Sequence, residues 1–181
     1  MFEVEIKAYL DDITSVETRL QQLDAIFQKS IHQSDTYFQH PIRNFAQTDE
    51  ALRIRISNNQ SYLTYKGPKL DSSSKTREEL ELKIQKPDKT SEILKKLGFS
   101  PVLIVTKTRK IYSMDDIIIS IDDVDDLGYF IEFELEVTDK EIIPSARDRL
   151  ISLLNKLGIP KDKLERRSYL ELRLLKMLGK L

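Results

Sequence analysis

Three charged side chains stand at alternate positions near the start of the chain. They are Glu3, Glu5 and Lys7, and the residues between them are apolar. In a β-strand, alternate residues point to the same face, so this segment places two carboxylates and one ammonium group on one side of a sheet. Carboxylate oxygens are ligands for a hard cation such as Mg²⁺, and a lysine ammonium attracts phosphate oxygens.

The same alternation puts further charges on one face of other strand-like segments, with acids and bases largely segregated. The bases are Arg53, Arg55, Lys66, Lys83, Lys107 and Arg109, and the later acids are Asp122, Glu132 and Glu134. Arginine offers a planar two-donor fork and lysine a point charge, and both suit phosphate oxygens. A site for a metal–triphosphate complex requires acidic side chains on one side, which bind the metal, and basic side chains on the other, which bind the phosphates.

Eight segments with a period-2 pattern predict the strands that carry these charges. They are 2–9, 34–39, 51–57, 61–66, 77–84, 103–113, 117–122 and 129–137. In the simplest arrangement the charged face of such a sheet lies in water. Exposed strand faces are usually rich in Thr and Ser, however, whereas nearly every position here is a full charge. We therefore predict an α+β fold: a closed eight-stranded antiparallel β-barrel, or tunnel, with a charged interior and helices packed outside.

Helical patterns between and after the strands supply the outer cover. They span residues 12–27, about 90–97, 146–157, and a last stretch from 162 or 167 to 178. Asp12 can cap the first, whose apolar stripe ends at Phe27, and Thr90 or Ser91 can open the second. The polar, turn-rich stretch 67–76 is expected to be a mobile loop. No stretch is long enough to be a linker, so residues 1–181 are predicted to form one domain.

The composition excludes several classes of protein. Lys and Arg number 29 and Asp and Glu 30 among 181 residues, and this near-balance argues against nucleic-acid binding through bulk charge. The absence of cysteine excludes disulfides and thiolate metal sites. No apolar run is long enough to span a membrane, and the alternating N-terminal segment is unlike a signal peptide. A cytoplasmic protein is the expectation.

The order of motifs along the whole chain resembles one known family. The motifs are ExExK (3–7), DTYF (35–38), ALRIR (51–55), YLTYKGP (62–68), REELELK (77–83), VTKTRKIY (105–112), IDDVDDLGYFIEFE (121–134) and RRSYLEL (166–172). Together they resemble the CYTH superfamily, also called the triphosphate tunnel metalloenzymes, and within it the class IV (CyaB-type) adenylyl cyclases. The resemblance implies an eight-stranded tunnel that binds Mg²⁺ or Mn²⁺ and a triphosphate such as ATP.

The resemblance also implies roles for individual residues. The implied metal ligands are Glu3, Glu5 and Glu132, with Asp122 and Glu134 nearby. The implied triphosphate ligands are Lys7, Arg55, Lys66, Lys107 and Arg109, with Arg53 and Lys83 in a second tier. Lys7, Lys107 and Arg109 are the expected catalytic residues, and Glu79 and Glu81 are expected to orient the bases.

Three functions remain open at this point. An adenylyl cyclase, which converts ATP to cyclic AMP and pyrophosphate, is favoured by the resemblance. A triphosphatase acting on inorganic triphosphate, thiamine triphosphate or a nucleotide would use the same charges, with a metal-oriented water as the nucleophile. A non-catalytic polyphosphate-binding module is least favoured, because the full set of metal ligands is present. The partners expected are a small triphosphate and no nucleic acid or membrane, and a homodimer is left open.

Overall fold

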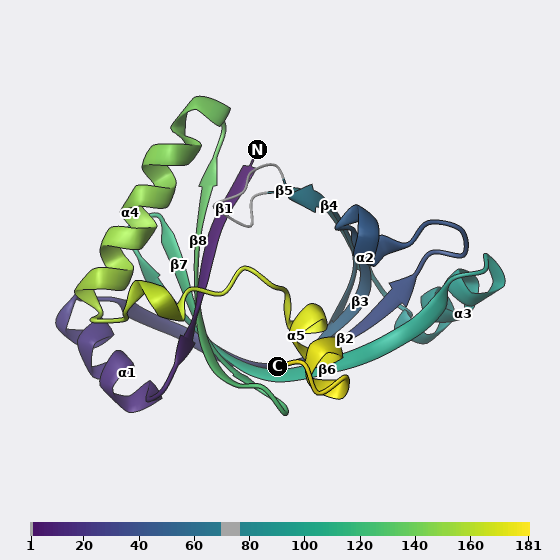
Figure 1. Cartoon of the computed structure of the whole chain (residues 1–181), viewed down its shortest axis with the longest axis horizontal. Helices are drawn as coiled ribbons and strands as arrows, with labels where there is room; N and C mark the ends of the chain where they lie inside the picture. The colour runs from purple at the N-terminus through teal and green to yellow at the C-terminus, as the bar shows by residue number, and fades with distance from the viewer. Residues whose placement is uncertain (1, 70–76) are drawn as a thin grey trace.

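The computed structural model describes residues 2–69 and 77–181 and shows one antiparallel sheet that curls around a central space (Figure 1). Its strands are β1 (Phe2–Leu10), β2 (Ile26–Gln39), β3 (Ala51–Ser57), β4 (Gln60–Lys69), β5 (Arg77–Ile84), β6 (Ser100–Met114), β7 (Ile117–Val124) and β8 (Gly128–Val137). Their order across the sheet is β1-β8-β7-β6-β2-β3-β4-β5. The prediction of eight antiparallel strands is confirmed. The predicted mobile loop lies mostly at 70–76, outside the described residues.

The two edges of the sheet, β1 and β5, approach each other across the top of the tunnel. Among the described residues they form no backbone ladder with each other. Glu3 on β1 nevertheless interacts electrostatically with Lys66 on β4 and Glu79 on β5. The sheet itself is therefore a strongly curled half-barrel. In a closed barrel, backbone hydrogen bonds would join the two edge strands, whereas here charged side chains of the two edges approach each other and complete the tunnel.

The helices between and after the strands are α1 (Ile13–Gln22), α2 (Phe45–Thr48), α3 (Pro87–Lys96), α4 (Ile143–Lys156) and α5 (Tyr169–Met177), with short 3₁₀ turns η1 (Lys140–Ile142) and η2 (Lys161–Lys163). Helices α1 and α4 cover the outer face of β1, β8 and β7 (Figure 1). Val4, Ile6 and Ala8 point outward into that core, which also contains Leu20 and Leu154. The alternate residues of β1 consequently point into the tunnel.

Helix α5 departs from the prediction that helices pack outside. Tyr169 and Leu172 of α5 are buried against Tyr37, Val105 and Phe130. These three residues share a strand face with the inward charges of β2, β6 and β8, so α5 packs against the inner face and fills one end of the tunnel. Ser168 and Glu171 form a capping box that fixes where this helix begins.

Two predicted helix boundaries were wrong. Helix α1 ends at Gln22, because Asp24 adopts a left-handed conformation with φ of 58° that breaks the helical path. Phe27 therefore belongs to the long strand β2, where its ring packs 5.3 Å from that of Tyr112. Helix α3 begins at Pro87, which suits a first helical turn. No helix in the described part of the chain is long and apolar enough to cross a membrane.

Candidate functional site

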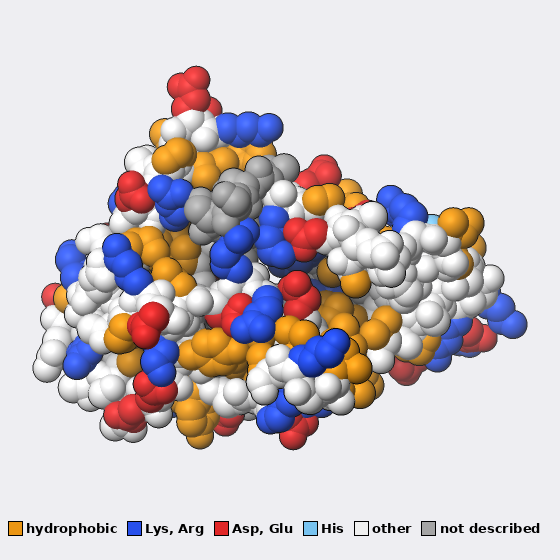
Figure 2. Space-filling view, viewed as in Figure 1, with side chains coloured by type: hydrophobic (Ala, Val, Ile, Leu, Met, Phe, Trp, Pro, Cys, Tyr) orange, Lys and Arg blue, Asp and Glu red, His pale blue; other side chains and the backbone are white. Residues whose placement is uncertain are grey.

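Charged side chains surround a hollow at the centre of the molecule. Figure 2 shows blue and red side chains gathered around it on the face presented. The residues that line this space come from both halves of the sheet, and include Glu3, Glu5, Arg53, Arg55, Lys66, Arg77, Glu79, Lys107, Arg109, Glu132 and Glu134. The predicted charged interior is thus present, and acids of β1 and β8 face bases of β3, β4 and β6 across it.

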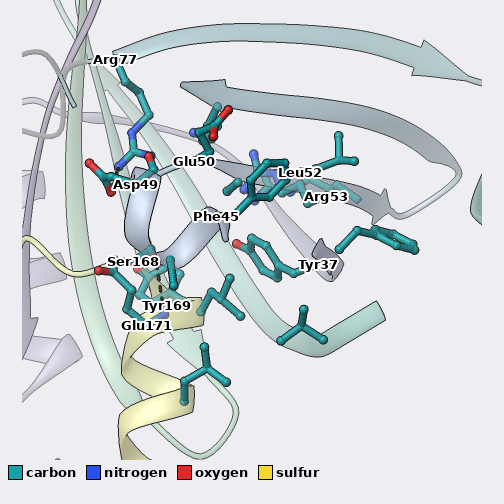
Figure 3. Close-up of a pocket in the computed structure, with 18 of the residues that line it drawn as sticks. Tyr37, Phe45, Asp49, Glu50, Leu52, Arg53, Arg77, Ser168, Tyr169 and Glu171 are labelled. Atoms are coloured by element: carbon teal, nitrogen blue, oxygen red, sulfur yellow. Dashed lines mark hydrogen bonds and ion pairs between the residues drawn. The ribbon is translucent and has the colours of Figure 1, made fainter. Parts of the chain in front are cut away.

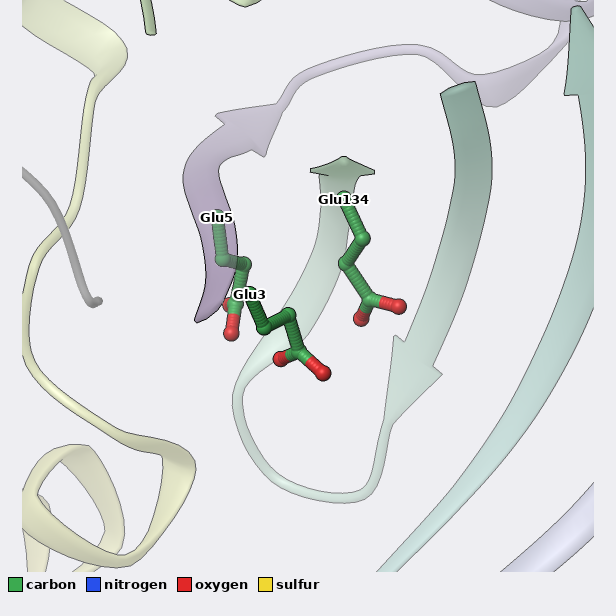
Figure 4. A group of neighbouring side chains, drawn as sticks. All are labelled: Glu3, Glu5 and Glu134. Atoms are coloured by element: carbon green, nitrogen blue, oxygen red, sulfur yellow. The ribbon is translucent and has the colours of Figure 1, made fainter. Parts of the chain in front are cut away.

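Three carboxylates from the first and last strands converge at one place. Glu3, Glu5 and Glu134 each bring an oxygen within 4.8 Å of the others (Figure 4). The strand register explains the meeting, because Glu5 lies directly opposite Glu134 and Glu3 is two residues along on the same face. We call these three residues the carboxylate group. All three were predicted near a metal.

The chemistry of the carboxylate group fits a hard divalent cation. Burial, together with the charge of Glu134, raises the pKa of Glu3 to about 8. Burial likewise raises the pKa of Glu134 to about 7, and the nearby Glu5 and Glu132 act in the same direction. Mg²⁺ or Mn²⁺ takes a donor set of this kind, one buried and two half-buried carboxylates that repel one another, with water and substrate oxygens completing the coordination.

The carboxylate group makes stability depend on pH in the metal-free protein. Because both raised pKa values belong to acids, Glu3 and Glu134 hold more protons in the folded chain than in the unfolded chain between about pH 4.5 and 8. We expect the melting temperature of the metal-free protein to fall as the pH rises through this window. Mg²⁺ or Mn²⁺ should raise the melting temperature more at the alkaline end, where the ligands are ionised. A metal-induced shift that is largest at acid pH would contradict this expectation.

Arg109 is held rigidly on the inner face of β6. Its Nε and Nη2 atoms donate to the two oxygens of Asp122, both at 2.6 Å, and Nη2 also donates to Glu132. Glu134 of the carboxylate group is 3.8 Å from Nη1. Although burial opposes its charged form, Asp122 and Glu132 hold the pKa of Arg109 well above its usual value. Arg109 therefore stays cationic beside the carboxylate group.

Glu132, predicted as a metal ligand, and Asp122, predicted to lie near the metal, are not part of the carboxylate group. The carboxylate of Asp122 is completely buried and accepts from Lys107 Nζ at 3.0 Å and from the Tyr169 hydroxyl at 2.8 Å, besides Arg109. Although burial opposes its ionisation, the positive charges of Arg109 and Lys107 hold the pKa of Asp122 below its usual value. The two acids orient Arg109, because Asp122 lies directly opposite it on β7 and Glu132 of β8 accepts from its Nη2.

Lys107 is the most deeply buried base of the central strand. Burial, followed by the neighbouring charge of Arg109, lowers its pKa to about 8. Its ammonium lies 3.0 Å from Asp122 and 4.7 Å from the centre of the Tyr169 ring. At neutral pH it remains mostly protonated and can still give up a proton at slightly alkaline pH.

Asp35 positions the two arginines of β3, and the sequence did not single it out as a site residue. It is buried on β2 directly opposite Arg55, whose Nε and Nη2 donate to its oxygens at 2.7 Å each. Arg53 Nη1 donates to the same carboxylate at 3.3 Å. The buried Arg53 Nε has no hydrogen-bond partner among the described residues, which leaves a donor for a bound anion. The strand pattern of DTYF could have revealed Asp35, since it is an inward acid opposite an inward base.

The remaining predicted bases divide between β4 and β5. Lys66 Nζ lies 2.5 Å from Glu79, as expected if Glu79 orients a base. Arg77, the first residue of the REELELK motif, lines the cavity and donates to the Asp49 and Gly67 carbonyls. Lys83 is exposed near the end of β5 and does not line the cavity, because β5 extends past the tunnel there.

Lys7 is turned toward the C-terminal segment. Its Nζ donates to the Arg167 carbonyl at 2.6 Å and lies 4.0 Å from the centre of the Tyr169 ring. The side chain is almost fully buried. The backbone amide of Glu165 also donates to the Lys7 carbonyl, at 2.8 Å. Tyr169, whose position the sequence gave no reason to choose, therefore lies between Lys7 and Lys107 and contacts Asp122.

Removing the Tyr169 hydroxyl tests this arrangement. Tyr169→Phe keeps the ring beside both lysines and removes one donor to buried Asp122. We expect the free energy of unfolding to fall by about 1.5–3 kcal/mol, the usual contribution of a hydrogen bond to a charged group. Urea denaturation measures it. Tyr129→Phe, at a 41% exposed position, is the matched control and should change stability by less than about 0.5 kcal/mol. Equal losses in the two variants would show that the contact contributes nothing.

One end of the cavity is apolar. Tyr37 and Leu52 line it from the sheet, Phe45 from α2, and Leu170 and Leu174 from α5. Figure 3 shows Tyr37 and Phe45 next to each other, with Tyr169 below them at the start of α5. The charged tunnel thus continues into a pocket that can take a flat or apolar group.

Comparison with known proteins agrees with this architecture. Residues 1–169 match the CYTH domain family. The chain is 46% identical over 173 residues to a Methanocaldococcus jannaschii protein named "Putative adenylate cyclase MJ0240", covering 96% of this chain and 99% of the relative. It is 30% identical over 172 residues to "Adenylate cyclase CyaB" of Aeromonas hydrophila, covering 93% and 86%.

A solved structure gives the same result for the fold. The PH1819 protein from Pyrococcus horikoshii superposes with a TM-score of 0.90 at 46% identity, covering 96% of this chain and 99% of that chain. The sheet, the inward charges and the sequence relatives all lead to one assignment. The chain belongs to the CYTH domain family.

Proposed function

We propose that this protein is a metal-dependent adenylyl cyclase that converts ATP to cyclic AMP and pyrophosphate. The observation that carries the proposal is that the carboxylate group and a row of fixed cations face the same cavity from opposite sides. CYTH family members are adenylyl cyclases or triphosphatases, and the two sequence relatives described above are named adenylate cyclases.

Each set of residues has a distinct task in this proposal. Glu3, Glu5 and Glu134 would hold Mg²⁺ or Mn²⁺, which when bound neutralises phosphate charge and orients the oxygens. Arg53, Arg55 and Lys66 would bind the phosphate chain, and Asp35 and Glu79 keep these bases in place. Fixed cations of this kind lower the barrier because they need no rearrangement as charge develops.

The chemical step is an in-line displacement. The 3′-hydroxyl oxygen of ATP forms a bond to the α-phosphorus, the bond from that phosphorus to the bridging oxygen breaks, and pyrophosphate leaves with the bonding electrons. The hydroxyl proton passes to solvent. Arg109 and Lys107, fixed by Asp122, would stabilise the negative charge on the reacting and leaving phosphates. Lys7 would support the tunnel end by holding the C-terminal segment.

The apolar end of the cavity favours a nucleotide over inorganic triphosphate. A phosphate chain needs only charged contacts, and the charged part of the tunnel supplies them. Tyr37, Phe45 and Leu170 add a surface that suits a base. The competing hydrolase reaction would use a water in place of the 3′-hydroxyl, with the same cations.

Product analysis separates the reactions. The protein is incubated with ATP and either Mg²⁺ or Mn²⁺, and cyclic AMP, ADP, pyrophosphate and phosphate are resolved by chromatography. We expect equal amounts of cyclic AMP and pyrophosphate. Phosphate release from ATP or inorganic triphosphate without cyclic AMP would overturn the cyclase in favour of a triphosphatase. Binding without turnover of any triphosphate would favour a module that only binds.

The charges also predict how ligands affect stability. A ligand that binds only the folded state raises the melting temperature by mass action, and one with more phosphate oxygens satisfies more of the tunnel cations. ATP with metal should therefore raise the melting temperature clearly, and AMP much less, in a differential scanning measurement. Equal shifts for ATP and AMP would contradict a site built for a triphosphate.

A further inference from the structure

An amide side chain lies among the apolar residues at one end of the cavity. Gln39, the last residue of β2, lines this end together with Phe45 and Leu174. It follows two residues after Tyr37, which is directly opposite Arg53 in the strand register. Alternate residues of a strand share a face, so Gln39 continues the inner face of β2 from the level of the arginines into the apolar end.

The amide group of Gln39 has one defined orientation. Its Nε2 atom donates to the His40 carbonyl at 3.2 Å and also to the Arg43 carbonyl. Because both acceptors lie at the same end of the amide, the amino group must occupy that end, and both of its hydrogens are used. The amide oxygen, Oε1, accepts from no group in the described part of the chain. Gln39 therefore offers a free acceptor next to apolar walls.

Other acceptors at this end of the cavity are already occupied. Asp49 and Glu50 each accept hydrogen bonds from neighbouring side chains. Ser168 and Glu171 bond each other's backbone amides in the capping box of α5. These groups are held by the protein itself, whereas the oxygen of Gln39 remains available to a ligand.

A free acceptor in an apolar pocket selects a ligand that brings a donor. Adenine carries an amino group, which is a donor, at position 6, and guanine and hypoxanthine carry a carbonyl oxygen there. A glutamine with both ends free can form two hydrogen bonds to adenine. Here Nε2 is already used, so the contact is a single hydrogen bond from the amino group to Oε1. A carbonyl at position 6 would set two acceptors against each other and lower the affinity.

The spacing along β2 suits a nucleotide. Asp35, which holds Arg53 and Arg55, lies four residues before Gln39 on the same strand face. Four residues of a strand correspond to about 13 Å. A nucleoside that extends from a phosphate chain bound at these arginines spans a length of this order, so its base reaches Gln39.

We propose that Gln39 determines base specificity, because its Oε1 accepts a hydrogen bond from the 6-amino group of adenine and rejects a 6-oxopurine. This inference rests on the proposed function, in which ATP is the substrate. It extends that proposal by naming the residue that distinguishes the base, which the charged part of the tunnel cannot do.

A pair of ligands that differ at position 6 tests the role of Gln39. Calorimetric titration in the presence of Mg²⁺ compares a non-hydrolysable ATP analogue with the matching analogue of inosine triphosphate. We expect the wild type to bind the ATP analogue about tenfold more tightly or better, since the inosine analogue loses the hydrogen bond and opposes two acceptors. Gln39→Leu removes the acceptor and should bring the two affinities to within about twofold of each other.

Gln39→Lys gives a sharper result. Its ammonium can still donate to the His40 and Arg43 carbonyls, so the loop contacts are kept, but it presents a donor to the base in place of an acceptor. The preference should therefore reverse in favour of the inosine analogue. The added charge attracts both analogues equally and leaves their ratio unaffected. Because it keeps the loop contacts, this variant also decides the matter if Gln39→Leu does not fold.

Gln28→Leu is the matched control. Gln28 is an exposed glutamine of the same strand, and its Nε2 donates to Ser113 Oγ at 2.7 Å. This variant should keep the wild-type preference for the ATP analogue. If Gln39 only supports the loop, its variants will weaken both analogues by the same factor, and an unchanged ratio would overturn the proposal.

Further outcomes separate this inference from the proposed function. Equal and tight binding of both analogues by the wild type would overturn the role of Gln39 and leave the cyclase proposal standing. Binding of inorganic triphosphate without binding of either nucleotide analogue would overturn both, because the apolar end would then accept no base.

Discussion

Arg109→Lys is expected to lower kcat for the proposed cyclase reaction by about 10²-fold or more, which corresponds to roughly 2.7 kcal/mol. Lysine keeps the positive charge, so attraction of the anionic substrate survives. It loses the planar fork whose Nε and Nη2 atoms bind both oxygens of Asp122. Steady-state kinetics with ATP and Mn²⁺ measures the effect, and the fall in kcat should exceed any rise in KM.

The matched control for this variant lies on the outer surface. Arg149→Lys on α4 makes the same chemical change in an exposed residue that pairs with Asp116. Its kinetics should equal those of the wild type. If Arg109→Lys behaves like Arg149→Lys, the guanidinium group does not act on the reacting phosphates. A rise in KM with unchanged kcat would show that Arg109 only attracts the substrate.

Glu5→Gln should abolish most of the activity at ordinary metal concentrations. Glutamine keeps the size of the side chain but removes a charged oxygen ligand from the carboxylate group. We expect the metal concentration for half-maximal activity to rise by about tenfold or more, with a lower maximal rate. Titration of activity with Mn²⁺ measures both quantities, and EDTA should abolish wild-type activity reversibly.

A glutamate outside the tunnel controls for this substitution. Glu92→Gln on α3 changes an exposed ion pair with Lys89 and should leave the metal titration unchanged. A normal metal requirement in Glu5→Gln would remove Glu5 from the proposed metal site. Full activity of the wild type in metal-free buffer would remove the site altogether.

Much of the fold was predictable because the charges follow the strands. The alternation at Glu3, Glu5 and Lys7 gave β1 its correct position and faces, and the acids of β8 followed in the same way. The register Glu5 to Glu134 then brings distant parts of the chain together. Period-2 patterning is informative here because one face of nearly every strand is fully charged.

The predictions were wrong where the boundary or position of an element depends on contacts with residues outside that element. The end of α1 depends on the left-handed Asp24, and apolar spacing alone carried the predicted helix on to Phe27. The inward position of α5 depends on Tyr169 meeting Asp122, 47 residues earlier in the chain. Nothing in the local pattern of residues 166–172 distinguishes an inner helix from an outer one, because its apolar stripe serves either place.

The sequence pattern also could not show which of the inward acids would form the carboxylate group and which would hold Arg109. Glu132 and Glu134 share a strand face, and the prediction made Glu132 a metal ligand and placed Glu134 nearby. The register of β6 with β7 places Asp122 opposite Arg109, and Glu132 lies one strand further on, so these two acids fix the arginine. Glu134 lies opposite Glu5 and completes the carboxylate group. Pairing between strands, which alternation does not reveal, decides between these roles.

Calorimetric titration of the chain with a non-hydrolysable ATP analogue tests the central claim most directly, because it measures binding independently of which reaction follows. The tunnel should bind the analogue tightly when Mg²⁺ or Mn²⁺ is present and much more weakly after EDTA treatment, and AMP should bind weakly in both conditions. Binding of the analogue that is unaffected by metal, or affinity for AMP equal to that for the analogue, would contradict a tunnel that joins a metal to a triphosphate.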